Sequence, residues 1–235
     1  MRLQDLTALV VHVRPYRESS AMVQFFTREQ GRLVGVMKGL RRGRRPQHVQ
    51  PFQLGRLACS GRGGLLTVTS FETTERFALA GDPLSAGFYV LELLNRSLAE
   101  RQPEPGVFDA AVAVLRLLAH DAELAPNLRQ FELTLLAQLG YGLDYQHDSR
   151  SGEAIVADVA YRLVEDEGFV RAEPADPSAP GQSIPGWVLL AIAAGDFQQA
   201  QVLHTAKRLN QQSLAPLIGS APLVSRSLYT GNPRG

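Results

Sequence analysis

Cysteine and long apolar runs are almost missing from this chain of 235 residues. Cys59 is its only cysteine, so no disulfide can form within the chain and a zinc site made of cysteines is excluded. Such scarcity is typical of reducing compartments and predicts a cytoplasmic protein. No apolar stretch approaches the ~18 residues of a membrane span. Asp5 and the alternation around it indicate a strand at the N-terminus rather than a signal peptide.

Signatures of catalysis are missing as well. No two of the five histidines stand at metal-ligand spacing, and neither H-E-x-x-H nor G-x-S-x-G occurs. The string GRGGLL at 61–66 lacks the lysine and the following helix of a phosphate-binding loop, so a hairpin turn explains it better. The acidic run 165–167 precedes Gly168 and is typical of a solvated turn. We therefore expect no catalytic residue, no metal site and no cofactor.

Positive charge is concentrated in the N-terminal third of the sequence. Residues 1–82 hold thirteen Lys and Arg against six Asp and Glu, for a net charge of +7. Residues 83–235 hold eleven against seventeen, for a net charge of −6. Between Gln30 and Phe71 there are eight basic residues and no acid. A segregated field of this kind predicts a polyanionic partner for the N-terminal part of the chain.

The densest part of this field is the string KGLRRGRRPQH, residues 38–48. Arginines that neutralise phosphates release counterions, so a cluster of them gives strong, salt-sensitive and sequence-tolerant binding. Arginine also stacks on exposed bases. The alternative is a solvated loop whose charge is incidental. We favour nucleic-acid binding because the segments on either side of the loop are basic too.

The N-terminal part has the pattern of a small β-barrel. Short apolar and β-branched segments follow one another at hairpin spacing and predict five strands, at 6–13, 20–27, 32–37, 52–59 and 65–71. One long loop follows the third strand. This order predicts a closed or nearly closed antiparallel barrel of the OB type.

Barrels of the OB type bind single strands in a groove that combines cations with aromatic platforms. The aromatic candidates are Tyr16, Phe25, Phe26 and Phe52, although a core position is the alternative for each phenylalanine. Tyr16 follows Pro15 in a predicted turn and is the best exposed of them. We expect the DNA-binding residues to be Arg14, Tyr16, Arg32, Lys38, Arg41, Arg42, Arg44, Arg45, Arg56 and Arg62.

From Pro83 onward the apolar spacing changes to that of helices. It predicts five of them, at 87–100, 107–120, 125–140, 187–197 and 201–218. Residues 144–183 are rich in Asp, Glu, Ser, Gly and Pro, so we expect an irregular or β-poor segment there. The predicted class is thus α+β, with an OB-fold DNA-binding domain at 1–82 and a mainly α-helical domain at 83–235.

Several strings together resemble the RecO family of bacterial recombination mediators. They are RPYRESSAMVQFFTREQGRLVGVMKGLRR, QPFQLGRL, LRQFELTLLAQLGYGLDY and AKRLNQQSLAPLIGSAPLVSRSLY, in the family's order. The resemblance implies an OB-fold followed by a helical domain. It also implies a non-catalytic role in DNA repair, at a cytoplasmic, nucleoid-associated location. Such proteins bind single- and double-stranded DNA, anneal complementary strands, and help RecA load onto DNA coated by single-strand-binding protein, together with RecR.

Many members of this family carry a four-cysteine zinc module after the L-G-Y string. The matching stretch here, DYQHDSRSGEAIVADVAY, has no cysteine, so the resemblance places the chain in the zinc-free branch. The family also docks the C-terminal tail of single-strand-binding protein on its helical domain. By position in the motif, the resemblance implies that this tail contacts Arg116, Leu128, Arg129 and Phe131. The spacing predicts that Arg129 lies beside the apolar stripe of its helix without being buried, so that its guanidinium can reach a ligand. The alternative for both arginines is an ordinary surface position on an amphipathic helix.

Two other classes of function fit the same features in part. One is an RNA-binding OB-fold factor of the translation apparatus, since phosphates carry no information on the sugar. The other is a nucleotide-processing enzyme, which the lack of an acidic metal site disfavours. Competition between DNA and RNA oligomers tests the RNA-binding alternative. A metal-dependent cleavage assay tests the enzyme alternative.

Overall fold

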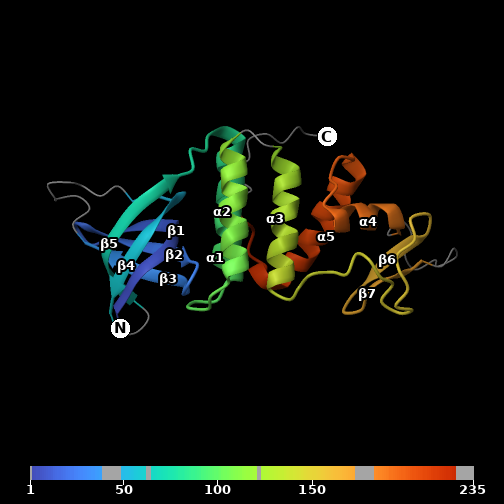
Figure 1. Ribbon diagram of the computed structural model, residues 1–235, viewed down its shortest axis with the longest axis horizontal. Coiled ribbons are helices and arrows are strands. Elements are labelled where there is room, and N and C mark those ends of the chain that lie inside the picture. Colours follow the sequence, from blue (N-terminus) through green and yellow to red (C-terminus); the bar gives the residue numbers. More distant parts are fainter. Residues whose placement is uncertain (1, 39–48, 62–64, 121–122, 173–182, 226–235) are drawn as a thin grey trace. The chain divides into compact units, whose positions relative to one another are not determined.

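The computed structural model describes residues 2–38, 49–61, 65–120, 123–172 and 183–225 (Figure 1). The chain divides into two compact units. The first consists of Met1–Asn127 together with Pro216–Gly235, and the second of Leu128–Ala215. No helix among the described residues is long and apolar enough to cross a membrane.

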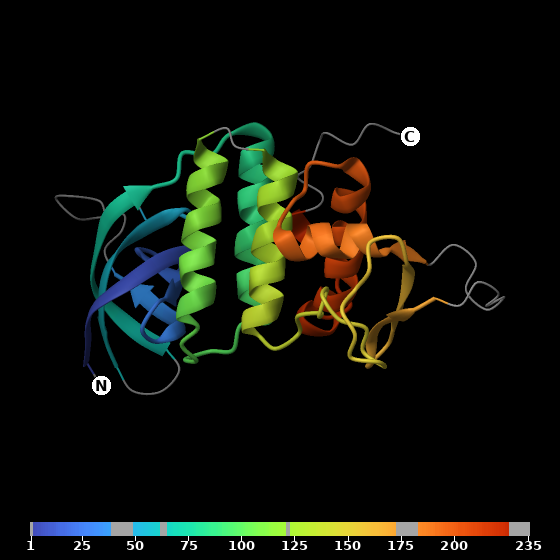
Figure 2. The ribbon, with the colours of Figure 1, turned by 45° about the vertical axis from the view of Figure 1, so that its right-hand side comes forward.

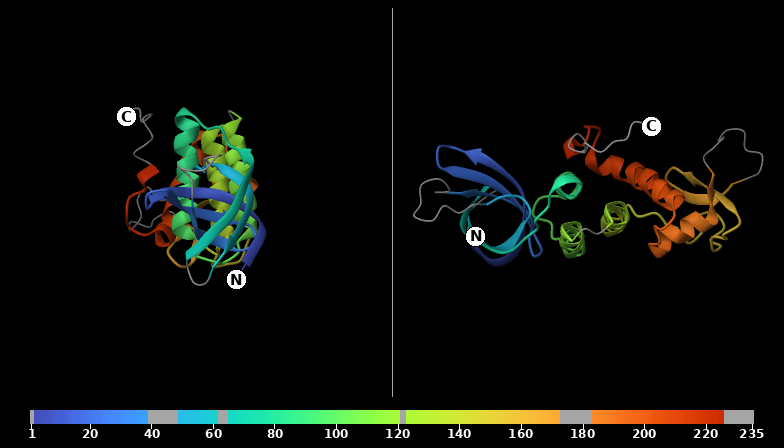
Figure 3. Two further views of the ribbon diagram at one scale, coloured as in Figure 1. Left: turned by 90° about the vertical axis from the view of Figure 1, so that its left-hand side faces the viewer. Right: turned by 90° about the horizontal axis from the view of Figure 1, so that it is seen from above.

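Five strands form a closed barrel in the first unit, in the ring order β1-β2-β3-β5-β4 (Figure 3, right). Their bounds are Arg2–Tyr16 (β1), Ser20–Thr27 (β2), Gly31–Met37 (β3), Gln53–Ser60 (β4) and Leu65–Arg76 (β5). The predicted OB-like barrel is confirmed, but the expectation that it is antiparallel throughout is wrong, because β3 and β5 run parallel. Strand directions cannot alternate around a ring with an odd number of members, so one pair must be parallel.

Alternation along the strands fills the barrel from within. Phe25 points inward, where its ring centroid lies 5.4 Å from that of Phe71. The next residue, Phe26, points outward, as strand geometry requires. It is nevertheless buried, because its ring packs 5.4 Å from that of Phe108 on a helix. Neither phenylalanine is therefore exposed as a platform for bases.

Two helices complete the first unit beside the barrel, α1 (Gly81–Ser97) and α2 (Pro105–Ala119) (Figure 1). Proline is tolerated in the first turn of a helix, which explains the start of α2 at Pro105. Phe52 at the start of the barrel's fourth strand packs on α1, with its ring 4.9 Å from that of Phe88. These aromatic contacts bury one outer face of the barrel.

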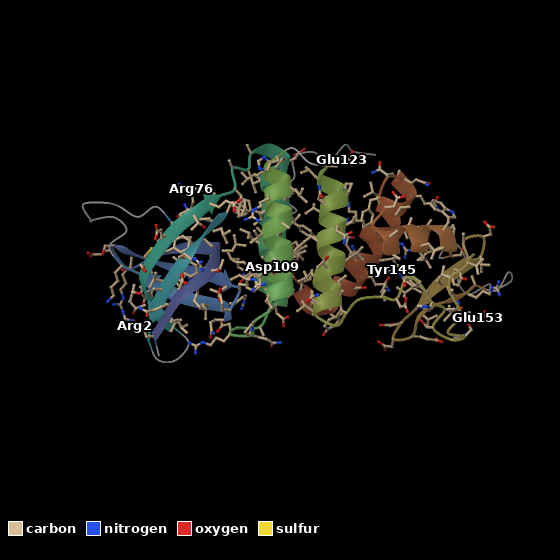
Figure 4. All side chains as sticks on the ribbon, in the orientation of Figure 1. Arg2, Arg76, Asp109, Glu123, Tyr145 and Glu153 are labelled. Atoms are coloured by element: carbon tan, nitrogen blue, oxygen red, sulfur yellow. The ribbon has the colours of Figure 1, made fainter. Side chains whose placement is uncertain are left out.

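Arginines tie the barrel to the two helices. Arg28 lies 2.9 Å from both carboxylate oxygens of Asp109, which is labelled on α2 in Figure 4. Close by, the backbone N–H of Arg101 donates to the carbonyl of Arg32. A Cβ on Gly31 would lie 2.0 Å from the carbonyl oxygen of Gln102, so only glycine fits this junction, where φ is +68°.

The second unit combines helices with a small sheet. It holds most of α3 (Leu124–Gln138) and α5 (Ala200–Ile218), all of α4 (Gly186–Ala194), and strands in the order β7-β6-β8. Figure 2 shows these strands beside α4. Their bounds are Ala160–Val164 (β6), Gly168–Arg171 (β7) and Ile184–Pro185 (β8).

The prediction of an irregular or β-poor segment at 144–183 did not include the short strands β6 and β7. Tyr161 and Phe169 are buried in one apolar cluster with Val188 and Ile192 of α4, which gives these short strands a core to pack on. Their apolar residues stand between acidic and glycine-rich turns, so the composition of the segment concealed them. The part of the segment at 173–182 lies outside the described residues.

Candidate nucleic-acid interface

Three of the predicted DNA-binding residues, Arg14, Tyr16 and Lys38, lie at the same end of the barrel. Strand pairing places Tyr16 opposite Ser20, and Met37 opposite Ala21. The end of β1, the start of β2 and the end of β3 therefore meet at the same end of the barrel. Lys38 follows β3 directly and is exposed. Arg41, Arg42, Arg44, Arg45 and Arg62 lie outside the described residues, but the first four follow Lys38 in the chain.

Arg14 brings an accessible positive charge to this end. It is exposed, and its Nη2 lies 2.8 Å from Sδ of Met22 on the neighbouring strand. Among the residues that the structure describes, neither Arg14 nor Lys38 forms an ion pair. A cation without a carboxylate partner keeps its full attraction for phosphate. Arg14 and Lys38 are therefore suited to hold a polyanion.

Tyr16 is the last residue of β1 and is followed by the turn at 17–19 that leads to β2. Its side chain is half-buried, and the guanidinium of Arg17 lies 5.1 Å from its ring centroid. Arg17 was not among the predicted DNA-binding residues, although its position next to Tyr16 in the string RPYR was a signal for it. A tyrosine ring with an arginine over it is a surface on which a base can stack.

The structure does not bring Arg56 and Arg32 to this end. Arg56 is exposed on β4, but its Nε lies 3.5 Å from Asp5, and strand pairing places it opposite Glu72. Arg32 is half-buried and donates to the backbone carbonyl and the side-chain oxygen of Asn95 on α1. It therefore joins the barrel to α1 instead of extending the basic surface.

Arg116, predicted to hold a partner's tail, also contacts the barrel. Its Nε and Nη2 lie 2.9 and 2.7 Å from the two carboxylate oxygens of Glu75 on β5. The hydrogen bond to Glu75 raises the pKa of Arg116, and the same bond, against the effect of burial, lowers the pKa of Glu75. The Arg116 side chain remains 51% exposed, so its guanidinium stays within reach of solvent.

The other three predicted tail contacts belong to the second unit and are buried. Leu128 is 8% exposed and Phe131 3%, as expected of an apolar stripe. The expectation that Arg129 lies beside this stripe without being buried is wrong, because Arg129 is only 7% exposed. Its Nη2 lies 2.5 Å from Oε1 of Glu132, one helical turn further on.

A buried polar network explains why the interior of the second unit tolerates this arginine of α3. Asn210 of α5 donates through Nδ2 to the second carboxylate oxygen of Glu132, at 2.9 Å. Glu132 and Asn210 are both fully buried. Burial, and then the charge of Glu132, raise the pKa of nearby Tyr145, which Figure 4 labels. Arg129 is thus neutralised by a partner within the fold and does not present its charge to a ligand.

In residues 144–161, side chains that could bind a metal already have hydrogen-bond partners within the fold. Asp148 accepts three backbone N–H groups, from Arg150, Ser151 and Arg171, at 2.7 to 3.0 Å. Nδ1 of His147 lies 2.9 Å from Asp144. Among the described residues, no three His, Cys, Asp or Glu side chains are grouped to hold a metal ion. Asp148 and His147 are therefore engaged within the fold.

A basic, OB-like barrel followed by helices has the charge and shape of a protein that binds a polyanion, and comparison with known families identifies the class. The model for the N-terminal part of recombination protein O matches residues 1–77, and the model for its C-terminal part matches residues 80–226. The chain therefore belongs to the RecO family of DNA repair and recombination proteins.

Individual relatives extend over nearly the whole chain. The DNA repair protein RecO of Cellvibrio japonicus is 38% identical over 99% of this chain and 100% of its own length. That of Stutzerimonas stutzeri is 42% identical over 94% of this chain and 92% of its own. That of Haemophilus influenzae (strain 86-028NP) is 38% identical over 95% of this chain and 94% of its own.

Proposed function

We propose that this protein is a recombination mediator that acts by binding and not by catalysis. It binds single- and double-stranded DNA, anneals complementary strands, and helps RecA load onto DNA coated by single-strand-binding protein, in cooperation with RecR. Family membership supports the role in repair and recombination. The observation that carries the DNA-binding part is the basic end of the barrel, where Arg14 and Lys38 have no ion-pair partner among the described residues.

The mechanism we propose for annealing is electrostatic. Two complementary strands repel each other through their phosphates, and cations that neutralise some of these phosphates reduce the repulsion. Arginines bind phosphate without reading the base, so the same surface accepts both strands whatever their sequence. Watson–Crick pairing then supplies the specificity. The acidic remainder of the chain, with a net charge of −6 over residues 83–235, disfavours DNA elsewhere on the protein.

The test is a titration of fluorescent single-stranded DNA at several salt concentrations. The variant replaces Arg41, Arg42, Arg44 and Arg45 by serine. We expect the slope of log K against log salt to shrink by about 0.7 for each phosphate that the variant no longer neutralises. The annealing rate of complementary strands should fall in parallel. A slope and an annealing rate equal to those of the unmodified protein would refute the proposal.

A matched control separates the position of the charge from its amount. Replacing four exposed glutamines of the second unit by glutamate changes the net charge by the same amount; they are Gln198, Gln199, Gln201 and Gln212. We expect this control to keep the slope of the unmodified protein. Matched DNA and RNA strands in competition test the alternative of a translation factor, which a clear preference for RNA would favour.

We also propose that the helical part captures the tail of single-strand-binding protein. Arg116 suits the tail's terminal carboxylate better than Arg129 does, because half of its side chain is exposed. A carboxylate of the tail would compete with Glu75 for the same guanidinium. Arg116→Ala should therefore weaken binding of a tail peptide at least about tenfold, or roughly 1.4 kcal/mol.

Arg28→Ala is the matched control for that experiment, because Arg28 makes a similar two-oxygen contact with Asp109. We expect it to leave the affinity for the tail peptide unchanged. An equal fall in affinity in both variants would indicate that the tail responds to loosening of the barrel and helices. Unchanged affinity in Arg116→Ala would place the tail's cation elsewhere.

A further inference from the structure

The chain returns to α1 after its last helix and is held there by a pair of opposite charges. We call residues 219–225 the C-terminal strap. Arg96 donates from Nη1 to the carbonyl of Ala221, at 2.6 Å, and from Nη2 to that of Pro222, at 2.8 Å. Glu92, one turn earlier on α1, accepts the backbone N–H groups of Val224 and Ser225 at 3.0 and 2.8 Å.

All four of these hydrogen bonds go to the main chain of the strap. The two side chains on α1 are also paired with each other, with Nη2 of Arg96 2.9 Å from Oε1 of Glu92. They are only 20% and 15% exposed. A half-buried ion pair is destabilised if its remaining hydrogen-bonding positions stay empty. This surface of α1 therefore suits an occupant that supplies two carbonyls followed by two N–H groups.

The strap adds one apolar contact to this pattern. Leu223 is 5% exposed, whereas the next residue, Val224, is 68% exposed. One buried aliphatic side chain between main-chain hydrogen bonds is a common way to recognise a short peptide, since the backbone gives affinity and the pocket gives selectivity. Gly219, the first residue of the strap, has φ +71° and nothing within 4 Å of the position that a Cβ would take. The strap is thus attached to α5 through a residue that tolerates a wide range of backbone angles.

We propose that Glu92 and Arg96 form a peptide-binding site on α1 and that the C-terminal strap is its resident occupant. The partner that fits is a short segment of another protein with a proline followed by an aliphatic residue, as in Ala221–Ser225. Binding of this partner displaces the strap, so the strap sets the affinity that a partner must exceed. The proposal is independent of DNA binding and can be tested without DNA.

The probe is a fluorescent peptide with the sequence of residues 219–226, added to the full-length protein. In the unmodified protein the strap competes at the high effective concentration of a tethered ligand. In Leu223→Asp a charge replaces the buried leucine, so the strap leaves the site open. We expect this variant to bind the probe at least about tenfold more tightly than the unmodified protein does. Equal or absent binding in the two proteins would overturn the proposal.

Two controls test whether the probe occupies this site. Adding Glu92→Ala to Leu223→Asp should weaken probe binding at least about tenfold, because the two N–H groups lose their acceptor. A probe that carries the same leucine-to-aspartate change should not bind. Unchanged binding in either case would show that the probe lies elsewhere, which contradicts the proposal.

A second measurement does not depend on the folding of Leu223→Asp. In the full-length Glu92→Gln variant, amide hydrogen exchange should accelerate at Val224 and Ser225 and stay unchanged in the barrel strands. An excess of probe added to the unmodified protein should accelerate exchange at the same two amides by displacing the strap. Exchange at these amides that responds to neither change would show that Glu92 does not hold the strap.

Discussion

Arg129 and Glu132 stand three residues apart on α3 and neutralise each other in the interior of the second unit. The desolvation of a buried charge is costly unless a partner of opposite sign lies beside it. Removing one partner should therefore lower the free energy of unfolding far more than replacing both by apolar residues does. Arg129→Glu would place two carboxylates together in the core, so its effect on any ligand could not be separated from its effect on the fold.

We predict that Glu132→Leu alone lowers the free energy of unfolding by about 3–5 kcal/mol, because it leaves Arg129 buried without a partner. The double variant Arg129→Met with Glu132→Leu should recover most of this stability. Urea denaturation of the four proteins of this cycle measures both values. Gln130→Ala, at an exposed position of the same helix, is the control. Additive single effects would show that the two side chains do not depend on each other.

The basic end of the barrel leads to a prediction for its described residues. Replacing Arg14 and Lys38 by serine should lower the affinity for single-stranded DNA and reduce the salt slope by about 0.7 for each phosphate left without its cation. Arg56→Ser should change the slope less, because Asp5 lies 3.5 Å from Arg56 and already offsets its charge. Replacing Lys207 and Arg208, both exposed on α5, removes the same amount of charge as the first variant. A larger effect from this last pair would move the interface to the second unit.

Asp148 joins its own turn to the end of β7, which gives a prediction for stability and pH. Backbone hydrogen bonds, first from Ser151 and then from Arg171 and Arg150, outweigh burial and hold the pKa of Asp148 below its usual value. Asp148→Asn turns an amide N–H₂ toward one of these donors. It should cost about 1–3 kcal/mol of unfolding free energy at neutral pH. Asp158→Asn, at an exposed position, is the control.

The sign of the pH dependence follows from the direction of that shift. The folded protein holds the Asp148 proton less tightly than the unfolded chain does, so the stabilisation is complete above the unfolded pKa of about 3.9. It is lost as the pH falls through the lower, folded pKa. The difference in stability between the unmodified protein and Asp148→Asn should therefore shrink below about pH 4. A difference that stays constant into acid would show that the carboxylate charge has no role.

Gly31 gives a prediction with an internal control. Ala at this position would combine a φ of +68° with a Cβ 2.0 Å from the carbonyl of Gln102. Gly81 has a similar φ of +59° but nothing within 4 Å of the added atom. Gly81→Ala should lower the free energy of unfolding by about 1–2 kcal/mol, because of backbone strain alone. Gly31→Ala should lower it by roughly 1–3 kcal/mol more, because the added Cβ clashes with the carbonyl of Gln102. Thermal unfolding of the two variants under the same conditions separates these contributions.

The last prediction concerns zinc. The chain has one cysteine, and Asp148 already accepts three hydrogen bonds from the backbone. We expect elemental analysis of the purified protein to find no stoichiometric zinc. Zinc that survives treatment with a chelator would contradict this prediction.

The strands of the barrel were predictable because their signal is local. Alternation of apolar residues identified all five, and adjacency alone indicated that Phe25 and Phe26 face opposite ways. What covers the outward face was not predictable, because Phe26 meets Phe108 across more than eighty residues of sequence. The same holds for Arg116 and Glu75, which are 41 residues apart. No pattern within a single sequence relates residues at such distances.

The error at Arg129 has a different origin. Its partner stands only three residues away, at the spacing that places two side chains on the same side of a helix. The signal is therefore present in the string RQFE, but the apolar stripe by itself predicts an exposed arginine at its edge. A carboxylate at that spacing is a reason to consider burial of the whole pair. The basic loop at 38–48, by contrast, stays a prediction from composition, because all of it after Lys38 lies outside the described residues.

The parallel junction of β3 and β5 has a consequence for how the barrel comes apart. Among the residues that the structure describes it joins three pairs, from Val34 and Leu65 to Val36 and Thr67, and the other junctions of the ring are longer. Parallel pairs are also slightly less stable per residue than antiparallel ones. Partial unfolding should therefore begin here and turn the ring into an open sheet whose strands stay connected. The two newly freed edges would then carry unpaired N–H and C=O groups, which makes this brief opening the state most prone to aggregation.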